Sequence, residues 1–394
     1  MDIGDMLDRW PGVWQQLDLA ITTERATQTF VRLADTHAPS LTSRHTRGPV
    51  MQAMLEDEDA YRAGLVRYEN NLWGTGTVAL ETGRAVRKHI WLMAHLDTIS
   101  YIVHRKEGTR FRLIPLCYHQ IKEGRRRARA LSYAPATGTM ATCAEGEIVS
   151  EASGEHVYFE TDAAALPHGA RIVYHSQARV NQETLALEGN IDNAFACAAV
   201  YLATVCLAAL RASDTQAVPE LFAVFPDEEE GVTASGNQAF CKGSARLFNR
   251  APLEAVPNLV LVSDVMEGKD MSDGPGATGI RLGEGATYTA GSSRGKGAVV
   301  PPPLLSFQED LSDFLSPKGI HLKANRDGYS SRSDDVSVMM YTPNVALIGF
   351  LGTDRHFDQG IPQAHLADLM HLAKIMVVYT LIAQDESWRA KYLQ

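Results

Sequence analysis

The chain has 394 residues, of which 45% are hydrophobic and 21% are charged, and this composition excludes a disordered or fibrous protein. Its 37 Lys and Arg residues against 47 Asp and Glu residues give a net charge of −10, which argues against a nucleic-acid or anionic-membrane surface. The length suits one large domain or two linked domains.

Cysteine usage and the N-terminus indicate the compartment. The five cysteines are odd in number and form no Cys-x-x-Cys pair, which is typical of a reduced environment. The first ten residues are rich in acids and lack an apolar signal-peptide core, and no run of eighteen apolar residues occurs. We expect a soluble, cytoplasmic protein without a membrane segment.

The first hundred residues predict helices followed by a strand. Residues 12–36 and 50–66 have apolar positions at helical spacing, with turn and cap formers between them. Residues 85–103 form a long strand-like run after the turn signal "WGTGT". We therefore expect two surface helices and one central strand.

The middle of the chain has a different residue pattern from both ends. Residues 105–184 contain short β-like runs separated by turns, which predict a small inserted β-domain. Its basic run "EGRRRARA" lacks interleaved aromatic residues, so a solvated strand edge or loop is favoured over a nucleic-acid site. The predicted division is 1–104 for the first part of an α/β domain, 105–184 for the inserted β-domain and 185–394 for the second part.

Strands alternate with helices in the last two hundred residues, which predicts a mostly parallel sheet sandwiched by helices. In such a sheet, functional groups gather at the carboxyl ends of the strands. Several apolar runs end in acids or histidines, and a further acid heads a predicted helix. These residues are His95, Asp97, Asp227, Glu228, Glu229, Asp264, Asp354 and His356 at strand ends, and Asp192 in "GNIDNAF".

Each of these residues alone has an ordinary structural explanation. Asp192 can be a helix N-cap, and the acids of "DEEE" can complement a helix dipole. Together, five or six buried acids and imidazoles are costly unless a cation pairs them. Two histidines and three carboxylates are a common ligand set for two zinc-like ions.

Strand geometry assigns first roles. In His-x-Asp both side chains point to one face of a strand, so Asp97 can orient the ring of His95. The adjacent Glu228 and Glu229 point in different directions, which suits one metal ligand and one general base for a metal-activated water.

The ordered motifs "AHLDTISYIV", "GNIDNAF", "FPDEEEG", "LVSDV", "SSRSDDVSV" and "RHFD" resemble the metallo-aminopeptidases of peptidase family 42, the tetrahedral or glutamyl-aminopeptidase type. This resemblance covers most of the chain and implies a dinuclear zinc exopeptidase-like α/β fold with a small β-barrel-like insert. It also implies two divalent metal ions, zinc with cobalt or manganese as alternatives, and a homo-oligomer. The implied metal ligands are His95, Glu229, Asp264 and His356, with Asp192 bridging the ions; Glu228 is the implied general base, Asp97 the orienting carboxylate, and Ser333 and Asp334 the implied substrate-binding residues.

The chain departs from the family in two places. The last ligand is followed by "FDQGIPQAH" where family members continue with Ser and then Glu, so both His356 and His365 are candidates. We favour His356, because it follows a strand, whereas His365 begins a helix and is predicted as a cap. Thr98 stands where an acidic residue is common, which bears on substrate preference.

Three functions follow for comparison with the structure. The leading hypothesis is an aminopeptidase that removes the N-terminal residue of a peptide. The first alternative is a metal-dependent amidase or deacylase acting on one small metabolite, because pocket loops set specificity while metals supply the reaction. The second is a non-catalytic scaffold, which the complete set of candidate ligands disfavours.

Overall fold

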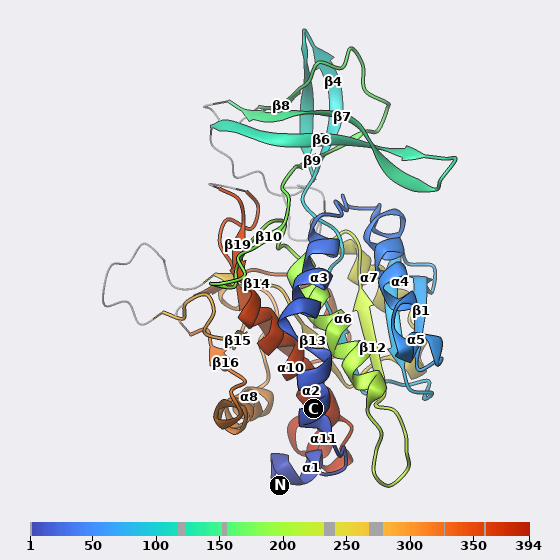
Figure 1. Ribbon diagram of the computed structural model, residues 1–394, viewed down its shortest axis with the longest axis vertical. Helices are drawn as coiled ribbons and strands as arrows, with labels where there is room; N and C mark the ends of the chain where they lie inside the picture. The colour runs from blue at the N-terminus through green and yellow to red at the C-terminus, as the bar shows by residue number, and fades with distance from the viewer. Residues whose placement is uncertain are drawn as a thin grey trace.

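The computed structural model describes residues 2–116, 123–151, 156–231, 241–267, 279–326, 328–357 and 360–394. A mixed sheet forms the centre, and a separate β-barrel stands at one end of the molecule, at the top of Figure 1. The architecture is therefore the expected α/β domain with a β-domain inserted into it.

The central sheet has its parallel strands in the middle. The order is β1-β2-β12-β3-β13-β18-β14-β17, with β15 between β18 and β16 off this path. Strands β12, β3, β13 and β18 are mutually parallel, and β2 joins β12 antiparallel. The bounds are β1 (Val66–Leu72), β2 (Thr77–Thr82), β3 (Ile90–Met93), β12 (Leu221–Phe225), β13 (Leu259–Val262), β14 (Val265–Glu267), β15 (Ala286–Thr289), β16 (Leu322–Ala324), β17 (Tyr329–Ser330) and β18 (Val345–Leu351).

Helices flank this sheet. The α6 sequence is apolar on every side and rich in Ala, so the helix is buried all round, against α3, α10 and the sheet. Helix α10 is long and apolar enough to cross a membrane by composition, but 78% of that window is buried inside the structure, as expected for a core helix. The helices are α1 (Ile3–Leu7), α2 (Val13–Ala20), α3 (Thr23–Ala34), α4 (Arg47–Glu56), α5 (Asp59–Arg62), α6 (Ala194–Ala209), α7 (Lys242–Arg250), α8 (Pro302–Leu315), α9 (Asp335–Val338), α10 (Leu366–Ala383) and α11 (Glu386–Tyr392).

The inserted domain is a closed barrel with the strand order β4-β5-β8-β7-β6-β9. Its strands begin at Tyr101, before the predicted start at 105, and end at Tyr174, before the predicted end at 184. The basic run lies on β6, where Arg125 and Arg129 pair with glutamates of neighbouring strands. The bounds are β4 (Tyr101–Glu107), β5 (Arg110–Pro115), β6 (Gly124–Ala134), β7 (Thr139–Ser150), β8 (Val157–Glu160) and β9 (Arg171–Tyr174).

A small three-stranded sheet joins two short strands that follow the barrel in sequence to a strand that directly precedes α10. It consists of β10 (Arg179–Val180), β11 (Ala186–Glu188) and β19 (Gln363–His365). His365 is the N-cap of α10: its Nδ1 accepts the Ala367 N–H at 3.2 Å and its Nε2 donates to the Thr184 carbonyl at 2.8 Å. Among the described cysteines, all four are free, and Cys117 lies outside the described residues.

Candidate metal centre

The predicted site residues come from loops at one edge of the sheet. His95 follows β3, the glutamates follow β12, Asp264 follows β13 and His356 follows β18. These four strands are parallel, so their carboxyl ends face the same edge. Asp192 reaches that edge from the segment just before α6.

His95, Asp192 and Asp264 form a first group of candidate ligands. Nε2 of His95 lies 3.1 Å from Oδ1 of Asp192 and 3.7 Å from Oδ2 of Asp264. Nδ1–H of His95 donates to the backbone carbonyl of Asp97 at 3.1 Å, which fixes the tautomer and leaves Nε2 free for a ligand bond. The histidine is therefore oriented as a metal-binding histidine is.

His356, Asp192 and Glu230 form a second group. Nε2 of His356 lies 3.3 Å from Oδ2 of Asp192 and 3.6 Å from Oε1 of Glu230. Asp192 thus offers one carboxylate oxygen to each histidine. A carboxylate between two such groups is the arrangement that can bridge two cations.

The glutamate that lies beside the second histidine is one residue later in the sequence than the predicted ligand. Glu230, and not Glu229, lies beside His356 and Asp192, while Oε2 of Glu229 is 3.9 Å from Nε2 of His95. Glu228 is turned to Arg246, with which it forms an ion pair. Glu228 has a φ of 60° and Gly231 a φ of 52°, so the segment is a turn, in which the side-chain alternation of a strand does not apply.

Asp97 holds this turn in place. Its carboxylate accepts the N–H groups of Glu229 at 3.0 Å and Glu230 at 3.2 Å, and the hydroxyl of Ser40 at 2.6 Å. The carboxylate lies 3.6 Å from Nδ1 of His95, so the ring is oriented mainly by the carbonyl of Asp97. One residue therefore positions both a candidate ligand histidine and two glutamates.

The pKa values of the site residues are shifted because acids and imidazoles are buried next to one another. Burial alone lowers the pKa of His95, but Glu229, Asp192 and other carboxylates raise it well above the usual value. Burial likewise lowers the pKa of His356, yet Glu230 and Asp192 raise it to about 9. For Glu229, burial raises the pKa and outweighs the opposing effect of His95.

Ser333 and Asp334 lie close to this centre. Ser333 lines a small cavity together with Asp264, and its N–H donates to Asp335 at 2.6 Å. The Asp334 carboxyl is fully buried and its pKa rises to about 7, because burial outweighs the lowering effects of His95 and the Ser244 hydroxyl. Both residues therefore lie at the edge of the candidate metal centre.

The loop that carries His356 is anchored in the inserted barrel. The Phe357 ring stacks on Tyr174 of β9, with centroids 4.8 Å apart, and belongs to the barrel core. The Tyr174 hydroxyl meets the Tyr101 hydroxyl at 2.6 Å. The barrel thus holds the residue next to a candidate ligand.

Two residues near the site have no role in the sequence analysis. One is Glu230, which is buried, and only the run of three glutamates indicates its segment. The charge of Arg355, beside His356, is felt by the candidate ligand carboxylates, which raise the pKa of its guanidinium, and only the position of an arginine next to a strand-end histidine would have indicated it.

The sequence matches no family model and no curated protein. Solved structures share the fold. A TET aminopeptidase from a marine sediment Thaumarchaeota archaeon has a TM-score of 0.71 at 15% identity, covering 93% of this chain and 99% of that one. Aminopeptidase APDkam598 from Desulfurococcus kamchatkensis has a TM-score of 0.69 at 16% sequence identity, and the match covers 94% of this chain and 98% of that one. The TET1 peptidase of Pyrococcus horikoshii has a TM-score of 0.65 at 15% sequence identity, and the match covers 90% of this chain and 99% of that one. That peptidase can assemble into a tetrahedron or a large octahedral shell. The chain therefore has the TET aminopeptidase fold.

Proposed function

We propose that this protein is a dinuclear metal-dependent hydrolase, an aminopeptidase that removes the N-terminal residue of a peptide. The observation that carries the proposal is Asp192, whose two oxygens lie 3.1 Å and 3.3 Å from the Nε2 atoms of two buried histidines. Similar solved structures described as aminopeptidases support the same reaction class.

The donor set fits two divalent ions. Asp192 Oδ1 and Glu230 Oε1 are buried and accept no hydrogen bond from the described residues, so both are available as ligands. His95 and Asp264 would hold one ion, His356 and Glu230 the other, and Asp192 both. Imidazole and carboxylate ligands suit zinc, and they also accept cobalt or manganese.

The ions, when bound, would polarise the scissile carbonyl and acidify a water molecule. Glu229 is the residue we assign as general base, in place of the sequence-based choice of Glu228. Its carboxylate is buried beside His95 and could itself join His95 and Glu230 around an ion, but the groups of His95, Asp192 and Asp264 and of Asp192, Glu230 and His356 are complete without it, so it can accept a proton and return it to the leaving amine. Glu228 is occupied by Arg246.

The matched pair Glu229→Gln and Glu228→Gln tests this assignment. With zinc, cobalt or manganese restored, the wild type should hydrolyse aminoacyl p-nitroanilides or short peptides. Glu229→Gln should lower kcat about 100- to 10,000-fold while two ions stay bound. Glu228→Gln should keep kcat within about threefold, because the ion pair of the Glu228 carboxylate in the described part of the chain is with Arg246 and not with a candidate ligand.

Metal analysis decides between this assignment and the sequence-based one. Loss of one ion per chain in Glu229→Gln, with Glu230→Gln retaining both, would return the ligand role to Glu229. A wild type that binds no stoichiometric metal would contradict the proposed function itself.

A second candidate is an amidase or deacylase for one metabolite. It is favoured by the loop after His356, which continues with Phe357 docked into the barrel where family members continue with Ser. N-acylated amino acids belong in the same substrate screen, and their turnover with inert peptides would decide for this candidate.

We further propose that the chain forms a homo-oligomer. The support is the fold shared with a peptidase that assembles into a tetrahedron or octahedral shell. Light scattering of the purified full chain measures the mass directly, and a monomer at micromolar concentration would contradict this part of the proposal.

A further inference from the structure

Arg47, the first residue of α4, is a cation buried inside the α/β domain, with none of its surface exposed. Its Nε donates to the carbonyls of Leu33 at 2.9 Å and Thr36 at 3.0 Å, at the end of α3. Its Nη1 donates to the carbonyl of Leu96 at 2.9 Å. Among the described residues, Arg47 has no carboxylate in ion-pair contact, and its Nη2 has no acceptor.

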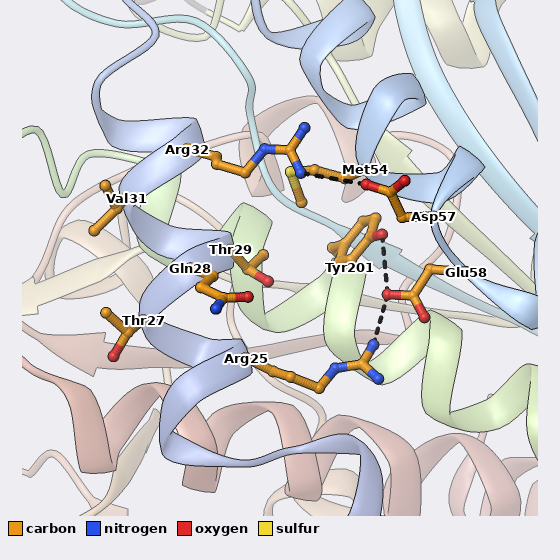
Figure 2. A pocket seen from close by; sticks show the side chains of 10 residues that line it. All are labelled: Arg25, Thr27, Gln28, Thr29, Val31, Arg32, Met54, Asp57, Glu58 and Tyr201. Atoms are coloured by element: carbon orange, nitrogen blue, oxygen red, sulfur yellow. Dashed lines mark hydrogen bonds and ion pairs between the residues drawn. The ribbon is translucent and has the colours of Figure 1, made fainter.

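Other arginines beside this helix are paired with acids. In the hollow of about 410 Å³ between α3, α4 and α6, Arg25 pairs with Glu58 at 2.6 Å and Arg32 faces Asp57 at 3.9 Å (Figure 2). Both of these arginines also keep part of their surface in solvent. Removing a charge from water is costly unless an opposite charge offsets it, so the full burial of Arg47 needs another compensation.

The compensation comes from the candidate metal centre. Burial lowers the pKa of Arg47 to about 10, and Cys197, Asp97 and Asp192 oppose this effect. The guanidinium therefore stays charged at neutral pH. Two of the three opposing groups are carboxylates of the site, so the charge of Arg47 is felt there.

The contact to Leu96 places Arg47 beside a candidate ligand. Leu96 stands between His95 and Asp97; its N–H donates to the carbonyl of Pro226 at 2.8 Å, and its carbonyl accepts from Arg47. The next carbonyl, that of Asp97, accepts Nδ1–H of His95 at 3.1 Å. Without Arg47, the buried Leu96 carbonyl would lose this donor, and the backbone that orients His95 would lose an anchor.

We propose that Arg47 is a positioning residue for the first group of candidate ligands, because it holds the backbone between His95 and Asp97 in the geometry that binds an ion. The inference rests on the proposed function and adds to it a residue that touches neither metal nor substrate. The two contacts to the end of α3 cap that helix, which is a structural role. Only the contact to Leu96 links Arg47 to the site.

Charge and geometry predict opposite results for Arg47→Met. Removal of a cation that Asp192 feels would by itself favour the binding of divalent ions. Removal of the donor to Leu96 displaces His95 and weakens binding, by about the 10- to 100-fold that is typical of residues that orient a metal ligand. The sign of the change in the zinc Kd therefore separates a positioning residue from a counter-charge.

Two single-site backgrounds assign the affinities. His356→Ala leaves the first group, His95→Ala leaves the second, and calorimetry measures the zinc Kd of the full chain in each. Added to His356→Ala, Arg47→Met should raise the Kd about 10- to 100-fold. Added to His95→Ala, it should change the Kd by less than about threefold, because Leu96 does not adjoin a ligand of the second group.

Arg47→Lys is the conservative variant. It keeps the charge and one donor for Leu96 but lacks the fork that also reaches the end of α3. In the His356→Ala background it should raise the zinc Kd by about three- to tenfold, less than Arg47→Met does.

Lys88→Met is the matched control for the loss of a buried cation. Lys88 is also fully buried, but it pairs with Glu220 and, at 3.2 Å, with Glu81. It stands before the amino end of β3, whereas His95 follows the carboxyl end. Lys88→Met should lower the Tm and change neither zinc Kd by more than about threefold.

An unchanged or lower Kd of the first group in Arg47→Met would overturn the proposal and leave Arg47 a helix cap or a counter-charge. An equal rise in both backgrounds would overturn it as well, because a general loosening of the fold would then explain the loss. Where Arg47→Met does not fold, Arg47→Lys decides by the same comparison. A wild type that binds no stoichiometric zinc contradicts the proposed function itself, and the inference falls with it.

Discussion

At the scale of single residues, Asp97 is the residue on which the geometry of the site depends most. Its carboxylate accepts two backbone N–H groups of the glutamate turn and one hydroxyl, all buried. An amide side chain cannot replace a carboxylate that accepts several hydrogen bonds, because its NH₂ group is a donor. The buried N–H groups that faced the lost oxygen would then have no acceptor.

Asp97→Asn is expected to destabilise the protein by about 1–3 kcal/mol and to weaken metal binding, because the amide NH₂ opposes the N–H groups of Glu229 and Glu230. Urea unfolding and metal titration measure the two effects. Ser40→Ala is the control, which removes one donor and should cost about 1 kcal/mol without a change in metal stoichiometry. Equal effects of both variants would contradict the role given to Asp97.

His371, on α10, makes the stability depend on pH. Burial lowers its pKa to about 4, with further lowering by His321, Lys374 and His365, and its Nδ1 accepts the N–H of His321 at 3.3 Å. The folded state therefore disfavours the charged form. Its contribution to the free energy of unfolding is complete above pH 6.5 and is lost as the pH falls from 6.5 to about 4.

His371→Gln should remove this dependence. At pH 4.5 the wild type should have lost about 2 kcal/mol through His371 that the variant does not lose. Urea unfolding of metal-free protein at pH 7.5 and pH 4.5 measures the difference. An identical pH dependence of the two proteins would show that His371 titrates normally in the fold.

The residues of the site illustrate what one sequence can predict. His95, Asp192, Asp264 and His356 were predictable because each stands at a strand or helix end, and parallel strands bring such ends together. The positions of the three glutamates were not predictable, because the positive φ of Glu228 and the hydrogen bonds from Asp97 set a turn that no strand rule describes. Their catalytic roles stay a prediction.

At the scale of elements, the loop after β18 depends on the barrel for its shape. Phe357 stacks on Tyr174 within the barrel core, while its neighbour His356 faces Asp192. Loss of the ring would leave a cavity in the barrel core and free the loop.

Phe357→Ala should lower the affinity for the second metal ion more than for the first, because the second group depends on His356 and the first on His95. Stepwise metal titration followed by calorimetry separates the two sites. Tyr174→Phe is the control, which keeps the stacked ring and removes only the hydroxyl that meets Tyr101. Equal loss at both ions would contradict a local effect of Phe357.

Helices and strands were predictable where the apolar pattern is strongly periodic. Segments whose conformation is set by long-range contacts were less predictable. The all-apolar α6 and α10 and the short strands of the barrel follow from pattern. The turn-rich segment before α4 was expected only to link helices, yet the N–H groups of Leu41 and Ser43 donate to Asp227 beside the site. Sequence pattern cannot indicate such a contact, because it joins residues far apart in the chain.

At the scale of the whole molecule, the site concentrates buried acids whose mutual repulsion opposes folding. Asp192, Glu229, Glu230 and Asp264 lie within one cluster, and in metal-free protein the two histidines and the guanidinium of Arg355 offset their charge only in part. Bound cations would offset it more fully. Stability and metal content should therefore be linked.

Zinc should raise the free energy of unfolding by about 3–4 kcal/mol per site at 100 to 1,000 times Kd, and EDTA should remove the gain. Thermal unfolding with zinc and with EDTA measures it. Asp192→Asn, which alters the carboxylate shared by both groups, should lose most of the effect. A wild type with the same Tm in both conditions would contradict the metal centre.

The spread of the ligands along the chain has a consequence for synthesis. His95 comes from the first quarter of the sequence, Asp192 from the middle and His356 from near the end, and none of the groups is complete within one contiguous segment. During translation the second group therefore cannot assemble until β18 has left the ribosome and joined the sheet beside β13. The second group can therefore take up an ion only late in synthesis, whereas all residues of the first group are present once Asp264 has been made.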